Sequence, residues 1–287
     1  MRYNIIIVSP FGYEHSRVFL ELGELIYYSI IELGFDASFK FEEIDWLSPN
    51  KASLLATSGG VNIVLGAHLL DETWIPFLHP ETIIVNTEQI GATMWTKRIF
   101  EFARNFEVWD YSPRNIIKLN DEHVKKVKHL RLGYQPELRR IIRNRQQDID
   151  VLFYGSIAPG DRREVILNSL ADCGLNVHRS FGVYGAERDE LISRSKIVIN
   201  IHNYDTHIFE SVRVFYLLTN SIPVVGEVNQ STMIDPAILE GIYPAKYEEL
   251  VETCVKLVGS NGLLESFREN LSYTKYPQPL FTSELLN

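Results

Sequence analysis

His202 and Glu210 are the residues of this chain whose types and spacing point most directly to chemistry, because they stand eight positions apart across a polar loop. An imidazole can donate a hydrogen bond to a phosphate oxygen, and a carboxylate can accept hydrogen bonds from two ribose hydroxyls. Phosphate and ribose occur together in nucleotides. These residue types therefore predict a nucleotide site that includes His202, its neighbour Asn203, and Glu210.

Two apolar runs enclose this loop and predict the elements that hold it. Residues 197–201 form a short run that is β-branched except at Asn200, which favours a buried parallel strand. Apolar positions among residues 209–218 recur at near-helical spacing, so we expect a helix that begins close to Ile208. Loops at the carboxyl ends of parallel strands hold ligands, and free N–H groups at a helix start attract a diphosphate. Phe209 is therefore expected to lie at the phosphate-binding start of this helix.

A second phosphate-binding feature follows the apolar run that ends at Tyr154. Gly155 and Ser156 open a loop of small residues that leads into a helix beginning with Arg162 and Arg163. Glycine lets the backbone approach phosphate closely, and a guanidinium can bind phosphate through two N–H groups. We expect one of the two arginines to face the diphosphate, and the alternative for each is a surface position.

The pair His202 and Glu210 resembles the pattern of GT-B glycosyltransferases, whose carboxyl-terminal domain carries a Glu or His followed eight positions later by a Glu. Residues 109–112, 150–156 and 209–213 are also similar to segments of bacterial spore-maturation-type (CgeB-like) glycosyltransferases. The resemblance implies two Rossmann-like, doubly wound α/β domains that face a cleft. It also implies that His202 contacts the donor phosphate, that Glu210 binds the ribose, and that no cofactor is needed besides the nucleotide diphosphate sugar.

The same resemblance suggests two further donor contacts. The family's second domain usually holds the nucleotide base between a strand and a helix, where Gly182 and Gly185 flank Tyr184 in this chain. Tyr184 is expected to stack on the base, and the alternative is an ordinary turn before a helix. Glu227 ends an apolar run and is expected to bind sugar hydroxyls, as an acidic residue does near that place in some relatives.

The acceptor side of the reaction is expected on the first domain. Transfer to a hydroxyl requires a group that takes its proton, and the loop after the first predicted strand offers Glu14 and His15 beside Gly12. The inverting branch of the GT-B family has a Gly-His pair after its first strand. In this chain Gly12 is followed by Tyr13, Glu14 and His15, and we favour His15 slightly over Glu14 as catalytic base. A helix cap at this loop is the alternative.

His68 and Glu88 follow two other predicted strands and are expected to converge on the same side of the sheet. Each is expected to touch the acceptor or the donor sugar. The alternative for His68 is a packing role, since a single histidine after a strand usually satisfies its own surroundings.

A metal site is not expected in this chain. His202, Asp205 and His207 carry ligand types that suit zinc or manganese, but their spacing fits no established site. GT-B enzymes generally stabilise the leaving diphosphate with helix dipoles and basic residues, so the resemblance implies a metal-independent reaction.

Composition sets the outer limits on function. A chain of 287 residues with 45% hydrophobic residues supports two domains. The net charge of −9 disfavours diffuse attraction to nucleic acid, and the basic segments 124–131 and 139–145 are expected to be solvated faces. Two distant cysteines and the lack of a long apolar segment predict a cytoplasmic protein without a transmembrane segment.

Alternating apolar runs predict the element order and the domain boundaries. We expect domains at residues 1–147 and 148–270, with a tail at 271–287 that crosses back to the first domain by the same resemblance. The expected strands are 3–8, 36–41, 61–65, 82–86, 107–109, 126–129, 151–154, 176–178, 197–201 and 223–225. The expected helices are 17–33, 93–105, 112–120, 162–173, 187–193, 209–218 and 247–258.

Two other functions fit the same residues. One is a sugar-nucleotide-binding module without transferase activity, because a fold does not guarantee chemistry. The other is a glycosyltransferase that acts on modified nucleic-acid bases. The acceptor class therefore stays open among a glycan, a small molecule, a protein and a modified nucleic acid.

Overall fold

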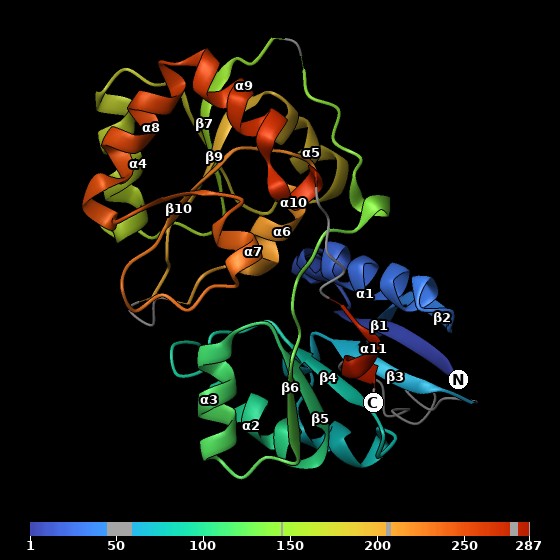
Figure 1. Cartoon of the computed structure of the whole chain (residues 1–287). Coiled ribbons are helices and arrows are strands. Elements are labelled where there is room, and N and C mark those ends of the chain that lie inside the picture. Colours follow the sequence, from blue (N-terminus) through green and yellow to red (C-terminus); the bar gives the residue numbers. More distant parts are fainter. Residues whose placement is uncertain (45–58, 145, 205–207, 276–280, 287) are drawn as a thin grey trace. The chain divides into compact units, whose positions relative to one another are not determined.

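The computed structural model describes residues 1–44, 59–144, 146–204, 208–275 and 281–286. The chain divides into two compact units, Met1–Gln135 with Leu280–Asn287, and Pro136–Pro279 (Figure 1). Each unit is built on one parallel sheet. The predicted pair of Rossmann-like α/β domains is confirmed.

The first unit contains a six-stranded sheet in the order β2-β1-β3-β4-β5-β6. Residues Ile5 to Val8 of β1 are at most 1% exposed, as expected for a parallel strand covered on both faces. The strand order reverses between β1 and β3, which makes their carboxyl ends the topological switch point of this sheet. The strands are β1 (Arg2–Pro10), β2 (Asp36–Ile44), β3 (Val61–Leu65), β4 (Ile83–Asn86), β5 (Glu107–Asp110) and β6 (Lys126–His129).

Helices connect these strands. The helix expected over residues 17–33 is instead a 3₁₀ helix, η1 (Glu14–Phe19), followed by α1 (Leu20–Glu32). The other helical elements of this unit are η3 (Ala67–Leu69), η4 (Glu72–Phe77), α2 (Thr96–Asn105), α3 (Pro113–Asp121) and α11 (Ser283–Leu286).

The second unit contains a five-stranded sheet in the order β11-β10-β9-β7-β8. Its switch point lies between β7 and β9, because the chain leaves β7 for β8 on one side and returns to β9 on the other. The strands are β7 (Ile149–Tyr154), β8 (Val177–Ser180), β9 (Ser195–Asn200), β10 (Val224–Glu227) and β11 (Tyr243–Ala245), of which β11 was not expected.

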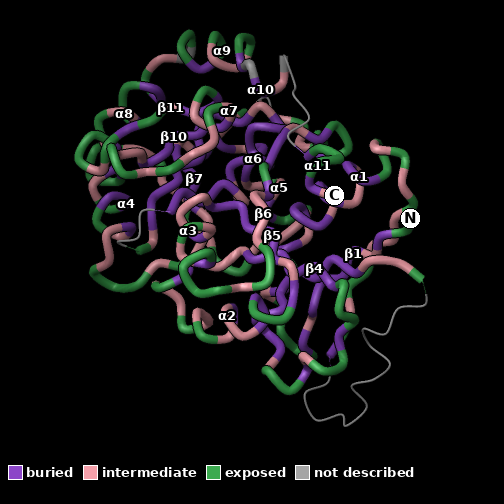
Figure 2. Tube along the Cα trace, turned by 60° about the horizontal axis from the view of Figure 1, so that its bottom comes forward, coloured by how far each residue is buried: buried purple, intermediate pink, exposed green. Residues whose placement is uncertain are grey.

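The helices of the second unit pack around a buried sheet. Side chains of α4 and α8 form one core with Val151, Phe153, Ile197 and Ile199, and the strands β7 and β10 lie within the buried interior in Figure 2. The elements are η5 (Pro136–Leu138), α4 (Arg162–Asp172), α5 (Gly185–Ser193), α6 (Ser211–Thr219), α7 (Pro236–Leu239), η6 (Tyr247–Glu249), α8 (Leu250–Val258), α9 (Asn261–Asn270) and α10 (Ser272–Lys275).

The division between the units differs from the expected boundary at residues 147 and 148. Residues 136–147 belong to the second unit because Asn220, at the end of α6, holds their backbone. Its Oδ1 accepts from the N–H groups of Arg140 and Ile141, each at 2.8 Å, and its Nδ2 donates to the carbonyl of Leu138 at 3.0 Å. Residues 281–286 are grouped with the first unit.

Candidate functional site

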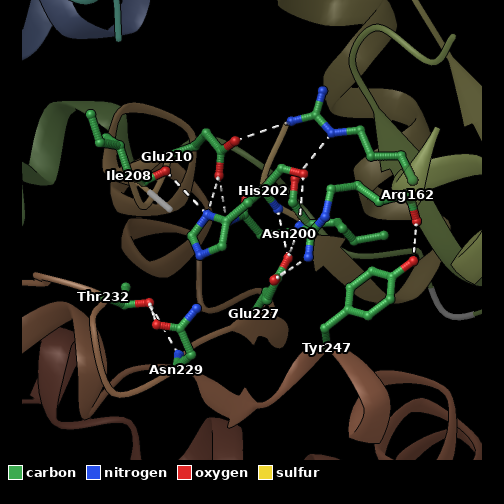
Figure 3. Close-up of polar contacts among 11 residues, drawn as sticks. Arg162, Asn200, His202, Ile208, Glu210, Glu227, Asn229, Thr232 and Tyr247 are labelled. Carbon is green, nitrogen blue, oxygen red and sulfur yellow. Dashed lines mark hydrogen bonds and ion pairs between the residues drawn. The ribbon is translucent and has the colours of Figure 1, made fainter. Parts of the chain in front are cut away.

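Polar side chains gather at the carboxyl ends of β7, β9 and β10 in the second unit (Figure 3). His202 lies directly beyond β9, and its residue is 0% exposed. Its Nδ1 lies 3.1 Å from the carbonyl oxygen of Ile208. Because a carbonyl oxygen only accepts, this bond requires a proton on Nδ1. His202 could therefore donate from Nε2 to a phosphate only as the imidazolium ion.

Glu210 occupies the N-cap position of α6, which begins at Ser211 rather than near Ile208. The expected helix start was wrong because Ile208 and Phe209, at 2% and 1% exposed, are buried before the helix begins. These two residues extend the apolar pattern of the helix toward the N-terminus, although their own backbone is not helical. Phe209 therefore packs beside the site, with its ring 6.2 Å from that of His202.

Both carboxylate oxygens of Glu210 are engaged by protein groups. Oε1 accepts from Arg163 Nη2 at 3.0 Å, and Oε2 accepts from Asn200 Nδ2 at 3.0 Å, with His202 Nδ1 at 3.7 Å. Burial by itself would raise the pKa of Glu210, but the contact with His202 and the charges of Arg213 and Arg163 lower it overall. Glu210 is therefore held as a carboxylate.

Arg162 and Arg163 both take part in the network, whereas the sequence led us to expect that only one of them would point inward. Arg162 forms a two-pronged pair with Glu227, at 2.6 and 2.7 Å, and stacks on the ring of Tyr247 with its Cζ 4.3 Å from the ring centroid. Glu227 also accepts from the N–H of His202 at 2.9 Å. Arg162 thus joins the start of α4 to the ends of β9 and β10.

Arg163 is 3% exposed and links the other side of the site. Its guanidinium donates to the carbonyls of Ile201 and Ser156, each at 3.1 Å, in addition to Glu210. Burial lowers the pKa of Arg163 to about 10, which still leaves the group charged at neutral pH. Arg163 therefore ties the loop after β7 to the end of β9 across the switch point.

Gly155 begins the loop after β7 with φ +151°, a conformation that side chains rarely adopt. A Cβ on Gly155 would lie 3.0 Å from Arg213 Nη2. Arg213 donates to Asn200 Oδ1 at 2.9 Å, so its guanidinium reaches Glu210 through Asn200. Glycine at this position leaves room for the arginine.

Three further predicted donor residues are Ser156, Asn203 and Tyr184. Ser156 is exposed, and Asn203 and Tyr184 are half-buried. Tyr184 is the N-cap residue of α5 and has extended backbone. The structure places these three near strand ends, where the sequence predicted them, and leaves the predicted base-stacking role of Tyr184 a prediction.

The sequence did not single out Asn200 and Tyr247. Asn200 interrupts a β-branched run, so a buried polar residue in a strand was the available signal. Tyr247 follows β11 and gave no comparable signal.

The predicted acceptor-side residues come together in part, at the β1–β3 switch point of the first unit. His68 Nε2 and Glu88 Oε1 are 3.6 Å apart. His15 lies in η1, with its ring 5.3 Å from that of Tyr13, and Glu14 begins the same 3₁₀ helix. Gly12 is exposed, with φ +74°.

Within the described part of the chain, no group of three His, Cys, Asp or Glu side chains is arranged to hold a metal ion. Asp205 and His207, the partners of His202 in the metal alternative, lie outside the described residues. No described helix is both long enough and apolar enough to cross a membrane.

No protein-family model matches the chain. It is 29% identical over 204 residues to the uncharacterized protein L140 of Acanthamoeba polyphaga mimivirus, across 68% of this chain and 66% of that protein. A second protein of that virus, the uncharacterized L138, is 29% identical over 142 residues, which are 48% of this chain and 15% of L138. The chain thus spans less than two thirds of either relative.

Solved structures resemble nearly the whole chain. T4 phage BGT in complex with UDP-glucose has a TM-score of 0.58 at 12% identity and covers 96% of this chain and 95% of its own. WaaG, a glycosyltransferase involved in lipopolysaccharide biosynthesis, has a TM-score of 0.57 at 13% identity and covers 98% and 96%. The likeness shows that the fold is that of GT-B glycosyltransferases. The likeness to spore-maturation-type enzymes stays a prediction.

Proposed function

We propose that this protein is a glycosyltransferase that binds a nucleotide diphosphate sugar on its second unit and transfers the sugar to an acceptor hydroxyl. The observation that carries the proposal is the buried network of Arg162, Arg163, His202, Glu210 and Glu227 at the β7–β9 switch point. Open α/β sheets bind their ligands at such points. The fold neighbours that bind UDP-glucose support the choice of ligand.

The charges of the network suit a diphosphate. Three guanidinium groups, those of Arg162, Arg163 and Arg213, interact with the carboxylates of Glu210 and Glu227, and the carboxylate of Asp161 also acts on Arg163. Fixed guanidinium groups favour an anionic ligand and stabilise the charge that grows on the diphosphate as it leaves. We therefore propose that the reaction needs no metal ion.

The network is also costly as a purely structural device. A buried ion pair often contributes no more stability than apolar residues of the same volume, because both charges lose water. Two such pairs within a single strand-end cluster are therefore better explained by ligand binding, for which fixed, pre-oriented charges are an advantage.

A donor panel tests the proposal. Thermal unfolding is measured with UDP-, GDP-, TDP-, ADP- and CMP-linked sugars, with and without EDTA. One donor class is expected to raise Tm in both conditions, because ligand binding to the native state stabilises it. A panel that leaves the Tm of folded protein unchanged overturns the proposal, and a shift abolished by EDTA contradicts metal independence.

A matched pair of variants locates the donor. Arg163→Lys removes the fixed guanidinium fork, and we expect the Kd of the stabilising donor to rise about tenfold or more, the equivalent of one charged hydrogen bond. Arg179→Lys is the control, because Arg179 is exposed on β8 and donates to Asn168 at 2.8 Å. Calorimetric titration gives both values, and equal affinities in the two variants would place the donor elsewhere.

A further inference from the structure

The His68–Glu88 pair stands out among the titratable groups of the first unit. His68 lies in η3 after β3, and Glu88 lies in the loop after β4, yet their side chains meet at 3.6 Å beside the switch point. The His68 side chain is 5% exposed and that of Glu88 is 28% exposed. One member is thus enclosed, and the other is open to a ligand.

The enclosure keeps His68 neutral. Its ring packs against Phe19 and Trp95, with centroids at 5.9 and 5.6 Å, and its carbonyl accepts from Arg98 Nη1 at 2.9 Å. Burial, with the charge of Arg98, lowers the pKa of His68 to about 4. The contact with Glu88 is therefore one between a neutral imidazole and a carboxyl group at neutral pH.

The surroundings of Glu88 favour a basic carboxylate. Burial raises its pKa, and a hydrogen bond from the Thr93 side chain opposes that rise without cancelling it. Burial raises the pKa of the Tyr13 phenol, and the charge of the nearby Glu88 carboxylate adds to that rise. A carboxylate with a raised pKa is a stronger base than a solvated one and suits proton transfer near neutral pH.

A buried polar cluster fixes the backbone of Glu88. Asn86 pairs with both its N–H, at 3.2 Å, and its carbonyl, at 3.0 Å, and Asn115 Nδ2 donates to the same carbonyl at 2.8 Å. Asp110, at 0% exposed, accepts from both asparagine amides. Buried polar groups need such complete pairing, and the result is a rigid support for Glu88.

We propose that Glu88 is the general base of the transfer reaction and that His68 is its positioning residue. The inference rests on the proposed function. Glu88 takes the proton of the acceptor hydroxyl while the acceptor oxygen bonds to the anomeric carbon. The bond from that carbon to the diphosphate oxygen breaks, and the nucleoside diphosphate leaves with the electron pair. Glu88 replaces His15 and Glu14, the bases favoured by sequence alone.

The first test measures the release of UDP from UDP-glucose with water as the acceptor. Glu88→Gln is expected to lower kcat about 10²- to 10⁴-fold, the usual contribution of a general base, without changing the Kd of UDP-glucose. Glu72→Gln, at an exposed position of η4, is the matched control. His15→Gln and Glu14→Gln are measured in parallel.

The outcomes separate the two proposals. If wild-type protein neither binds nor hydrolyses UDP-glucose or the other donors of the panel, the proposed function fails, and the base assignment fails with it. If wild type releases UDP and Glu88→Gln does so at the same kcat, only the base assignment is overturned. A loss of kcat in His15→Gln or Glu14→Gln instead also overturns that assignment alone.

A pH profile adds a readout that a structural defect does not reproduce. The wild-type rate is expected to rise with pH through the raised pKa of Glu88, and this limb is expected to vanish in Glu88→Gln. The groups that lie against Glu88 are Tyr13, His68 and the Thr93 hydroxyl, and Asp110 lies behind its loop with a pKa that burial raises to about 7. A limb that persists in Glu88→Gln comes from another group and overturns the assignment.

Two more variants test the separate roles. Formate added to Glu88→Ala is expected to restore UDP release, because it supplies the missing carboxylate, and a failure of rescue in a folded variant counts against a base at this position. His68→Gln is expected to move the pH limb while the Kd of UDP-glucose stays the same. An unmoved limb would show that His68 does not position Glu88.

Discussion

Burial shifts the pKa values of single side chains in this protein as much as neighbouring charges do. Glu210 and Glu88 are both partly or fully enclosed carboxyl groups, yet their pKa values move in opposite directions. Arginines and His202 surround Glu210, whereas Glu88 meets a neutral imidazole and a hydroxyl. The two carboxylates are therefore suited to different tasks, one to constant charge and one to exchange of a proton.

His68 gives this tuning a measurable effect on stability. Its pKa is lowered from 6.5 to about 4, so the unfolded chain binds a proton in this range before the native chain does. His68 is therefore expected to lower the free energy of unfolding as pH drops from 6.5 to about 4, by roughly 3 kcal/mol at 1.4 kcal/mol per pH unit, and Asp110, whose pKa is raised from 3.8 to about 7, opposes this fall. Urea unfolding across this range checks the slope.

Variants assign that slope to His68. His68→Gln is expected to remove this contribution, so that the variant loses less stability, or gains more, than wild type as pH drops. His79→Gln, at an exposed position, is expected to leave the wild-type slope in place. Glu88 acts with the opposite sign, because a raised pKa favours stability at low pH and loses that contribution as pH rises through it. An unchanged slope in His68→Gln would contradict the buried neutral state.

At the scale of elements, glycines in the loop after β7 let neighbouring side chains lie close to the backbone. Gly155 and Gly160 both have positive φ in the loop between β7 and α4. A Cβ at Gly155 would lie 3.0 Å from Arg213 Nη2, whereas a Cβ at Gly160 would meet no atom within 4 Å. The two positions share backbone strain, but only Gly155 borders the Arg213–Asn200–Glu210 chain of hydrogen bonds.

Substitution of the two glycines therefore distinguishes the effect of backbone strain from the effect of a steric clash with Arg213. Gly155→Ala and Gly160→Ala are each expected to lose about 1–3 kcal/mol of stability through the strained backbone. Only Gly155→Ala is expected to weaken donor binding as well, because the added methyl group displaces Arg213. Urea unfolding and calorimetric titration of both variants give the comparison, and equal donor affinities would contradict it.

Sequence patterns located these elements better than they located the contacts. Runs such as that of β3 were identified at their full length, because alternation between buried runs and polar turns is a local property. The start of α6 was misplaced because apolar spacing reports burial, and Ile208 and Phe209 are buried without being helical.

No local sequence pattern predicted which polar residues of the site would contact one another. Arg162 and Glu227 are 65 positions apart, and Asn86 and Asp110 are 24 apart. Each was visible as a polar residue at a predicted strand end or helix start, but which partner it would meet depends on sheet order. Sequence reasoning therefore found most members of the network at the β7–β9 switch point and missed the polar cluster that supports Glu88.

At the scale of the whole molecule, the first unit is completed by a distant segment of the chain. Phe281 is 4% exposed, and its ring lies 5.8 Å from that of Trp109 on β5. Lys128 Nζ donates to the carbonyl of Leu285 at 2.8 Å. The segment from Phe281 to Leu285 thus covers the β5–β6 side of the first sheet.

Removal of this cover is expected to destabilise the first unit. Phe281→Ala is expected to cost about 3 kcal/mol or more, the usual loss for a buried phenylalanine, while donor affinity stays unchanged. Tryptophan fluorescence during urea unfolding reports the loss, because Trp109 lies beneath the ring. Thr282→Ala, at an exposed position, is the control, and equal stability of the two variants would contradict a packing role.

The return of the chain also has a consequence during translation. The ribosome delivers residues 136–279, which form the second unit, before it delivers Phe281 and Leu285. Until then the nascent first unit lacks the cover over Trp109, and closing that contact spans most of the chain, which slows folding. The unit that is synthesised first is therefore the last to be completed.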